Sequence, residues 1–204
     1  MPPGFFLTID GPDGAGKSTV ARELEESLAA AGHAVWRTAE PSSGPVGTVV
    51  RQLVDDVTGD ALACLFAADR YHHLVTGIRP ALAAGWVVIC DRYLASSYVY
   101  QRLDGVDMEF LRNLHTHAEL PDLAVFLTVD RQTRVARLAG RDAPNRFEWD
   151  PEAAVAEIQL HADAARLLAS EGVDVLTLDS TATPATDLAS HIGARVRAGR
   201  KPAG

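Results

Sequence analysis

A glycine-rich run near the start of the chain has the spacing of a phosphate-binding loop. Residues 11–18 read Gly-Pro-Asp-Gly-Ala-Gly-Lys-Ser, and they match the pattern G-x-x-x-x-G-K-[S/T] at every fixed position. In such a loop the backbone N–H groups close around phosphate oxygens, and the helix that follows adds positive potential from its N-terminus. We expect Lys17 to reach the β- and γ-phosphates of a nucleotide and the Ser18 hydroxyl to ligate Mg²⁺.

The segments on either side of the loop are those that a phosphate loop requires. Residues 5–9 form a short apolar run of strand-forming side chains, and residues 19–31 carry apolar side chains at helical spacing. This order predicts a strand, a phosphate loop and a helix, rather than a glycine-rich turn that binds nothing. The chain has two lysines, and Lys201 lies in a polar tail, so Lys17 is the only lysine in the expected folded body.

A second candidate for phosphate chemistry is the pair Asp91-Arg92, which follows the apolar segment 86–90 directly. A carboxylate at the carboxyl end of a buried strand is where phosphate-loop proteins place the acid associated with Mg²⁺. An arginine in the same crevice would bind a second phosphate, as a transferase with a phosphorylated acceptor needs. The alternative for this pair is a surface ion pair without a ligand.

Strand-like and helical segments alternate along the whole chain. Five apolar segments have the length and composition of strands: residues 4–10, 33–38, 86–90, 123–129 and 173–178. Helical spacing is present at residues 18–31, 44–57, 60–84, 94–118, 131–140, 151–171 and 183–198. This alternation predicts a three-layer α/β fold with a five-stranded, mostly parallel sheet and helices on both faces.

The domain organisation expected from this pattern is a single domain over residues 1–204, because no linker or repeat divides the chain. Residues 141–150 break the helical pattern and contain two arginines, which makes them a candidate lid, with a plain connecting loop as the alternative. Residues 199–204 are expected to be a flexible tail.

Composition limits the class of partner. The formal net charge is −8 and no basic stripe is present, which argues against binding a nucleic-acid polymer. The chain shows neither a signal-peptide pattern nor an apolar stretch of about 18 residues, so we expect a cytoplasmic protein without a membrane span. Cys64 and Cys90 lie in apolar segments and form no C-x-x-C pair, and we expect both to be reduced core thiols.

Three further segments give the chain a family resemblance. They read Thr-Ala-Glu-Pro at 38–41, Leu-Phe-Ala-Ala-Asp-Arg at 65–70, and Asp-Arg-Tyr-Leu-Ala-Ser-Ser-Tyr-Val-Tyr-Gln at 91–101. In order and spacing, together with the loop at 11–19, they resemble thymidylate kinases, which phosphorylate dTMP to dTDP. The resemblance extends over almost the whole chain, and it implies the phosphate-loop kinase fold with a short arginine-bearing lid.

The resemblance implies a set of residues for the base and sugar of the acceptor. Phe66 matches an aromatic side chain that stacks on thymine. Arg70 matches an arginine at the base edge, and Ser97 and Gln101 match polar side chains that hydrogen-bond the base. Tyr100 matches a tyrosine that crowds the sugar and disfavours a 2′-hydroxyl.

It also implies roles around the phosphates. Arg92 matches the arginine on the acceptor phosphate, and Arg51 resembles a second arginine near it. Asp13 matches a carboxylate near the acceptor's 3′-hydroxyl, and Arg141 and Arg146 match lid arginines that close over the donor phosphates.

The chain departs from the family pattern at three positions. Ala39 replaces an arginine that the family often has, and Tyr98 stands where a smaller side chain is usual; both are expected beside the acceptor pocket. Gly14 stands where some relatives carry an arginine in the loop, and this fits the bacterial form, in which the lid supplies that charge.

The expected function is transfer of the γ-phosphoryl group of ATP to the 5′-phosphate of dTMP, with Mg²⁺ and without a covalent nucleophile. Three alternatives remain open at this point. One is a kinase of a modified or different pyrimidine monophosphate, another is a deoxynucleoside kinase with Glu40 as the base, and the third is a regulatory nucleotide-binding module without turnover. The family is usually dimeric, and helices 44–57 and 60–84 are the expected interface elements.

The expected site divides into four overlapping sets. The catalytic set is Asp13, Lys17, Arg92, Arg141 and Arg146. The ATP-binding set is Gly11, Pro12, Asp13, Gly14, Ala15, Gly16, Lys17, Ser18 and Thr19. The dTMP-binding set is Asp13, Glu40, Arg51, Phe66, Arg70, Arg92, Ser97, Tyr100 and Gln101. The metal set is Ser18 and Asp91.

Overall fold

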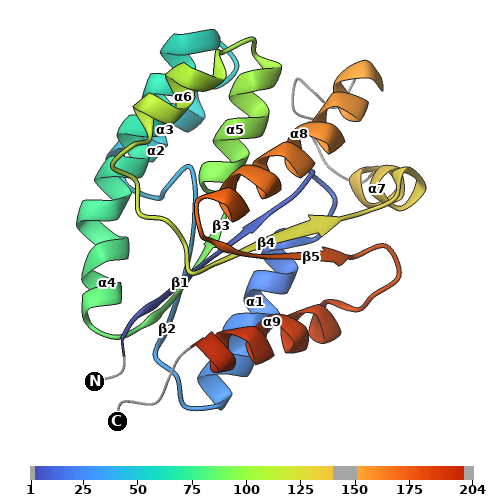
Figure 1. The fold of residues 1–204 in the computed structure, drawn as a ribbon. Coiled ribbons are helices and arrows are strands. Elements are labelled where there is room, and N and C mark those ends of the chain that lie inside the picture. The colour runs from blue at the N-terminus through green and yellow to red at the C-terminus, as the bar shows by residue number, and fades with distance from the viewer. Residues whose placement is uncertain (1–2, 140–150, 200–204) are drawn as a thin grey trace.

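The fold is built on one parallel sheet. A computed structural model describes residues 3–139 and 151–199, without the side chains of 151–154. The sheet has five strands in the order β2-β3-β1-β4-β5, and every neighbouring pair is parallel (Figure 1). The strands are β1 (Phe5–Asp10), β2 (Val35–Ala39), β3 (Val87–Asp91), β4 (Leu123–Thr128) and β5 (Asp174–Asp179). The predicted sheet is therefore confirmed, and it is parallel throughout these strands.

Strand β1 lies at the centre of the sheet, between β3 and β4. All of its residues are buried, as the apolar run at 5–9 predicts. The register pairs Ile9 with Asp91, so the carboxyl ends of β1 and β3 lie side by side. The glycine-rich loop and the Asp91-Arg92 pair thus leave the sheet at the same edge, where open α/β sheets bind their ligands.

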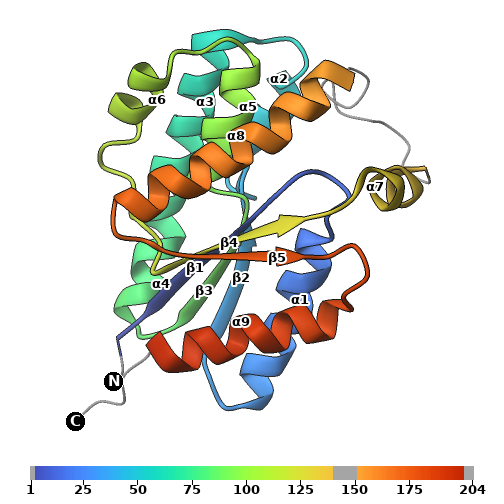
Figure 2. The same cartoon turned by 45° about the vertical axis from the view of Figure 1, so that its right-hand side comes forward.

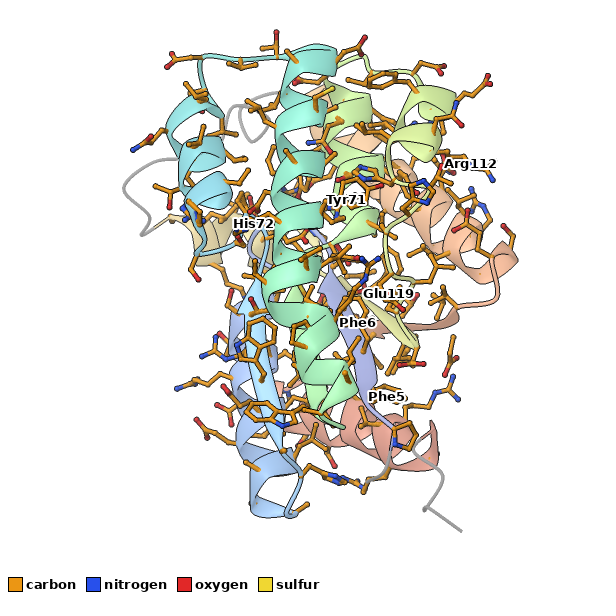
Figure 3. All side chains as sticks on the ribbon, turned by 90° about the vertical axis from the view of Figure 1, so that its left-hand side faces the viewer. Phe5, Phe6, Tyr71, His72, Arg112 and Glu119 are labelled. Atoms are coloured by element: carbon orange, nitrogen blue, oxygen red, sulfur yellow. The ribbon has the colours of Figure 1, made fainter. Side chains whose placement is uncertain are left out.

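Helices cover both faces of the sheet (Figure 2). On one face α1 (Lys17–Ala30) and α9 (Ala185–Gly199) pack together. On the other face lie α3 (Gly59–His73), α5 (Leu94–Leu103) and α8 (Pro151–Ser170). Successive side chains of a strand point to opposite faces, so Phe5 belongs to the α1/α9 core and Phe6 to the core on the opposite face (Figure 3).

The helical spacing seen in the sequence accounts for the way in which these helices are buried. Val20, Leu24 and Leu28 of α1 recur every four residues, and each is at most 1% exposed. They face Leu188 and Ile192 of α9 and the underside of the sheet in one apolar cluster. This packing fixes α1 with its N-terminus at the edge of the sheet where the glycine-rich loop lies.

The remaining helices are shorter. They are α2 (Pro45–Leu53), the π-helical turn η1 (Leu74–Ile78), α4 (Arg79–Ala83), α6 (Met108–Leu114) and α7 (Arg131–Leu138). The segment predicted as one helix at 60–84 is α3, η1 and α4 in continuous succession. The wide turn η1 comes just before Pro80, which lacks the N–H that a regular helix needs there.

The single helix predicted at 94–118 is wrong, because the structure has two helices there. The first ends at Leu103, and Gly105 takes a positive φ of 82°, which favours glycine. Asp107 then caps the second helix by accepting hydrogen bonds from the N–H groups of Glu109 and Phe110. A glycine followed by an N-capping aspartate was the signal for this break.

Two further expectations concern composition. Cys90 is buried, but Cys64 is exposed on α3, so the prediction of two core thiols is wrong for Cys64. The apolar spacing around it belongs to a helix face that this chain leaves uncovered. Among the described residues, the helices are too short or too polar to cross a membrane.

Candidate active site

The glycine-rich loop connects β1 to α1 at the carboxyl edge of the sheet. Gly14 and Gly16 both have positive φ, of 83° and 85°, which side chains other than glycine rarely adopt. No side chain caps the N-terminus of α1, which starts at Lys17. The first N–H groups of this helix therefore have no intrahelical or capping acceptor and favour an anion.

Lys17 is 6% exposed and lies across the loop. Its Nζ donates to the carbonyl oxygen of Pro12 at 2.9 Å and lies 3.5 Å from Oδ1 of Asp13. Burial, and next the charge of Arg92, lower the pKa of Lys17 to about 8. A bound phosphate would favour the protonated form, because it adds an opposite charge to this buried site.

Ser18 and Asp91 form the expected metal set, and the structure brings them together. The Ser18 hydroxyl donates to Oδ2 of Asp91 at 2.5 Å. The other oxygen of Asp91, Oδ1, is buried and has no hydrogen-bond partner among the described residues. A buried carboxylate oxygen without a partner, beside a hydroxyl and a phosphate loop, fits a Mg²⁺ ion.

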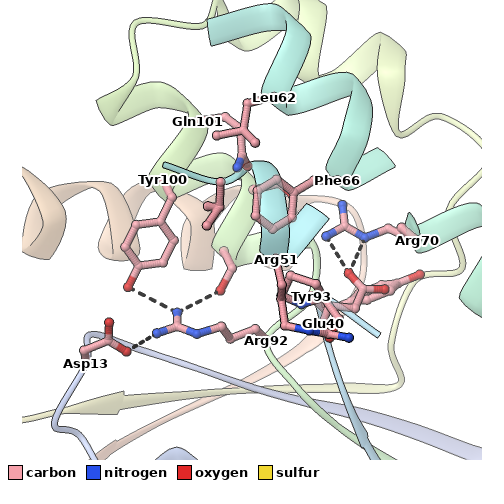
Figure 4. Close-up of a pocket in the computed structure, with 14 residues that line it drawn as sticks. Asp13, Glu40, Arg51, Leu62, Phe66, Arg70, Arg92, Tyr93, Tyr100 and Gln101 are labelled. Atoms are coloured by element: carbon pink, nitrogen blue, oxygen red, sulfur yellow. Dashed lines mark hydrogen bonds and ion pairs between the residues drawn. The ribbon is translucent and has the colours of Figure 1, made fainter. Parts of the chain in front are cut away.

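A pocket of about 250 Å³ lies next to the loop, between α2, α3 and α5 (Figure 4). It is lined by every residue of the predicted dTMP-binding set: Asp13, Glu40, Arg51, Phe66, Arg70, Arg92, Ser97, Tyr100 and Gln101. These residues come from segments that are far apart in the sequence. We call this cavity the acceptor pocket.

A second cavity, of about 280 Å³, lies over the glycine-rich loop and is called here the loop cavity. Lys17, Ser18 and Asp91 line it. Asp13, Glu40 and Arg92 line both this cavity and the acceptor pocket, so the two cavities meet at these side chains. Two phosphorylated ligands would therefore have their phosphates next to each other.

Arg92 occupies the boundary between the two cavities. Its guanidinium forms an ion pair with Asp13 and donates to the Tyr100 hydroxyl at 3.1 Å and to Ser96 Oγ at 3.4 Å. Its backbone has a φ of 67°, which is unusual for a residue with a side chain, and its N–H donates to the carbonyl of Ile9. Burial alone would lower the pKa of Arg92, but Tyr100 and Asp13 outweigh it and raise the pKa.

Arg70 and Glu40 form a second ion pair at the acceptor pocket, and it is buried. Nη2 of Arg70 lies 2.8 Å from Oε2 of Glu40, and both side chains are nearly inaccessible to solvent. Arg70 also lies 3.1 Å from the ring of His115 and 4.8 Å from the centre of the Tyr93 ring. The second oxygen of Glu40 faces His73 at 3.4 Å. Glu40 is thus held by two partners, which disfavours the role of a general base for a neutral hydroxyl.

The side chains expected at the base, which are Phe66, Arg70, Ser97 and Gln101, all line the acceptor pocket. The Phe66 ring lies across the pocket from Arg92 in Figure 4. Oε1 of Gln101 is buried and has no hydrogen-bond partner among the described residues. A buried polar atom at a pocket wall is a candidate contact for a ligand. Arg51 enters from α2 and donates to the carbonyl oxygens of Pro41 and Ser42, at 2.8 and 2.7 Å.

The structure corrects both departures that were expected beside the acceptor pocket. Tyr98 lies on the other side of α5, where it packs against His115 and lines a separate cavity. Ala39 lines the loop cavity instead of the acceptor pocket. Neither side chain lines the acceptor pocket. The candidate lid arginines, Arg141 and Arg146, lie outside the described residues.

Several residues at the site were missed in the sequence. Arg137 of α7 donates to the Gly14 carbonyl at 3.1 Å and to the Ser180 carbonyl at 2.8 Å. A third cavity, of about 330 Å³, lies beside the loop and is lined by Gly14, Arg137, Ser180 and Thr183. Arg134 and Glu157, which form an ion pair at 2.8 Å, complete the set that was missed. The three arginines of α7, which recur every three residues at 131, 134 and 137, were the only signal available for any of them.

The parallel sheet, the loop after β1, the carboxylate at the end of β3 and the adjoining acceptor pocket define a phosphate-loop kinase. The family model for thymidylate kinase matches residues 9–187. The thymidylate kinase of Leifsonia xyli subsp. xyli is 40% identical over 204 residues, which cover 95% of each chain. The thymidylate kinase of Ruegeria pomeroyi is 43% identical over 160 residues, covering 73% of this chain and 75% of the relative. The chain belongs to the thymidylate kinase family.

Proposed function

We propose that this chain transfers the γ-phosphoryl group of ATP to the 5′-phosphate of dTMP, giving dTDP and ADP. The observation that carries the proposal is the junction of the acceptor pocket and the loop cavity at Asp13, Glu40 and Arg92. This junction occurs in a member of the thymidylate kinase family.

The chemistry needs positioning and charge neutralisation more than a base. The attacking oxygen belongs to a phosphate that is already ionised, and the phosphoryl group passes through a transition state with little covalent participation by the protein. Arg92 and Arg51 hold the acceptor phosphate, while Lys17 and the N-terminus of α1 hold the donor. Glu40 binds Arg70 instead of removing a proton.

Magnesium belongs to this proposal, with Ser18 and Asp91 as the residues that hold it. The ion would neutralise charge on the β- and γ-phosphate oxygens. The partnerless Oδ1 of Asp91 supports this assignment. The described residues contain no cluster of three acidic, histidine or cysteine ligands, which suits Mg²⁺ because it usually takes one or two carboxylates together with phosphates and water.

Recognition of the acceptor is assigned to the wall opposite Arg92. Phe66 stacks on the base, and Ser97, Gln101 and Arg70 face its polar edge. Tyr100 lies at the sugar and disfavours a ribose. The support is that all five side chains line the acceptor pocket and that Gln101 has a buried oxygen without a partner in the described part of the chain.

ATP binding extends beyond the glycine-rich loop in this proposal. The cavity between Arg137, Ser180 and Thr183 adjoins Gly14 and offers room for the nucleoside part of the donor. Arg141 and Arg146 are proposed to close over the donor phosphates, because the loop has Gly14 in place of an arginine of its own.

We also propose a cytoplasmic location for this chain, and a homodimer formed through α2 and α3. Apolar residues recur at helical spacing on the exposed face of α3 and the turn after it: Ala61, Cys64, Ala68 and Val75. Val49 of α2 is 42% exposed as well. A second copy would cover this face.

The test is a coupled assay with Mg-ATP and a panel of acceptors: dTMP, dUMP, UMP, dCMP and thymidine. We expect kcat/KM to be highest for dTMP and no turnover of thymidine, because Glu40 is held by Arg70. A higher kcat/KM for dCMP or UMP would overturn the assignment of the acceptor, and turnover of thymidine would favour a nucleoside kinase.

A further inference from the structure

A buried carboxylate from α8 reaches the site without being part of any sequence motif. Glu157 is 3% exposed. Its Oε1 accepts a hydrogen bond from the Tyr100 hydroxyl at 2.8 Å, and its Oε2 lies 2.8 Å from Nη1 of Arg134. Neither Glu157 nor Arg134 lines the acceptor pocket, yet Glu157 bonds to a side chain that does.

These contacts form a path that begins and ends at the glycine-rich loop. From Glu157 the path continues through Tyr100 to Arg92, and from Arg92 to Asp13 in the loop. On the other side, Arg134 packs so closely on the loop that a Cβ added to Gly14 would lie 3.3 Å from its Cγ. The path thus connects α5, α7 and α8 with the point where the two cavities meet.

The direction of each hydrogen bond in this path follows from the donors and acceptors. An ionised carboxylate only accepts, so the Tyr100 proton points to Glu157, and the oxygen of that hydroxyl presents a lone pair to Arg92. Arg134 supplies the opposite charge that a buried carboxylate requires. Such connected hydrogen bonds strengthen one another in a medium of low dielectric constant.

The Tyr100 ring is also fixed by packing. The ring of His161, one turn after Glu157 on α8, meets it edge-on, with centroids 6.2 Å apart and an angle of 85°. The Arg92 guanidinium lies 5.0 Å from the centre of the Tyr100 ring. The hydroxyl and the ring of Tyr100 therefore both contact the Arg92 guanidinium and restrict its orientation.

We propose that Glu157 is a positioning residue that, held by Arg134, fixes the Tyr100 hydroxyl and through it the direction of the Arg92 guanidinium. The inference rests on the proposed function, in which Arg92 binds the acceptor's phosphate. Phosphoryl transfer depends strongly on the alignment of the two reacting oxygens, so a small rotation of Arg92 would weaken both acceptor binding and turnover.

A merely structural role for Glu157 is the competing explanation, because α5 and α8 also pack together. The chain offers a matched control for it. Asp163 of α8 lies 3.5 Å from Arg102 of α5, so this ion pair joins the same two helices, and neither residue lines the acceptor pocket. Asp163→Asn removes a contact between α5 and α8 without touching Tyr100 or Arg92.

The experiment compares steady-state kinetics of the wild type, Glu157→Gln, Tyr100→Phe, the double variant and Asp163→Asn, with dTMP and ATP varied separately and melting temperatures measured in parallel. We expect Glu157→Gln to raise the KM for dTMP about tenfold or more, the loss typical of a hydrogen bond to a charged group, with the KM for ATP changed less than about twofold. Tyr100→Phe should do the same, and the double variant should be no worse than either single variant, because both act through one hydroxyl.

Five outcomes decide the question. An unchanged KM for dTMP in Glu157→Gln, or additive losses in the double variant, would overturn the inference. Equal effects of Asp163→Asn and Glu157→Gln on KM would also overturn it, because the role would then be structural. If Glu157→Gln does not fold, an unchanged KM for dTMP in Tyr100→Phe would overturn the inference, because Glu157 is proposed to act through the Tyr100 hydroxyl. A wild type without dTMP kinase activity would instead overturn the proposed function, and this inference with it.

Discussion

Asp13 of the glycine-rich loop and Arg92 of the β3–α5 connection form an ion pair at the boundary between the acceptor pocket and the loop cavity. The pair joins the two segments that leave the sheet side by side after β1 and β3. A change in the position of either charge therefore acts on both cavities. In the proposed function, this relationship accounts for an arginine with several partners at the position of the acceptor's phosphate.

Arg92→Lys should impair the enzyme although the charge is kept. The guanidinium binds Asp13, Tyr100 and Ser96 together, and an ammonium group lacks this planar fork. We expect kcat/KM for dTMP to fall about 10- to 100-fold, which corresponds to about 1.4–2.7 kcal/mol. The measurement is steady-state kinetics with dTMP varied. Arg102→Lys on α5 is the control, and a similar loss there would show that the effect of Arg92→Lys is one of stability.

Lys17→Ala should nearly abolish turnover while the fold persists. Lys17 is buried at the loop cavity, where its charge would stabilise the transferring group. Loss of one such group lowers kcat by about 10²- to 10³-fold in other enzymes. The check is kcat together with the melting temperature. Lys201→Ala, at the chain's other lysine, should leave kcat unchanged, and near-normal kcat in a folded Lys17→Ala would contradict the mechanism.

Much of the site was predictable because its motifs are local. The glycine-rich loop needs a fixed spacing of a few residues, and Asp91-Arg92 comes directly after residues 87–90 of β3, which are completely buried. Once a parallel sheet is assumed, the carboxyl ends of its strands must meet at one edge. The sequence therefore sufficed to bring Asp91 and Arg92 to the loop, and the resemblance supplied the rest of the acceptor pocket.

What could not be predicted depends on tertiary packing or on the phase of a helix. Tyr98 lies about 100° further round α5 than Ser97, and this turns it away from the acceptor pocket toward His115. The motif alone does not show which side of α5 faces α8. Glu157 lacks any local signal, because its role arises only when α8 packs across α5. The sequence contained the signal for the helix break at Gly105, but the apolar residues on both sides of it continue at helical spacing and favoured one long helix.

Arg141→Ala and Arg146→Ala should lower kcat more than they raise the KM for dTMP. These arginines lie outside the described residues, so the prediction rests on the sequence at 141–150, which breaks the helical pattern, and on Gly14, which leaves the loop without an arginine of its own. An arginine that stabilises a transferring phosphoryl group can contribute about 10³-fold or more to kcat. Steady-state kinetics will check this.

The control for the lid arginines is Arg195→Ala, on the exposed surface of α9, where Arg195 pairs with Asp174. Proportional changes in kcat and KM would indicate an effect on lid closure instead of on the transferring group. Unchanged turnover in both lid variants would show that residues 141–150 only connect α7 to α8.

Phe66→Ala should weaken acceptor binding and leave ATP binding unaffected. The ring lines the acceptor pocket but not the loop cavity. Stacking of a base on an aromatic side chain contributes about 1–3 kcal/mol in single-stranded nucleic-acid sites, or about 5- to 150-fold in affinity. We expect the Kd for dTMP, measured by titration calorimetry, to rise within this range.

Leu65→Ala, on the same helix and outside the pocket, is the matched control, because it removes apolar volume without removing the ring. A Phe66→Ala protein that only melts earlier, with the Kd for dTMP unchanged in its folded fraction, would assign the ring to the core of the fold and leave base recognition to Gln101 and Ser97.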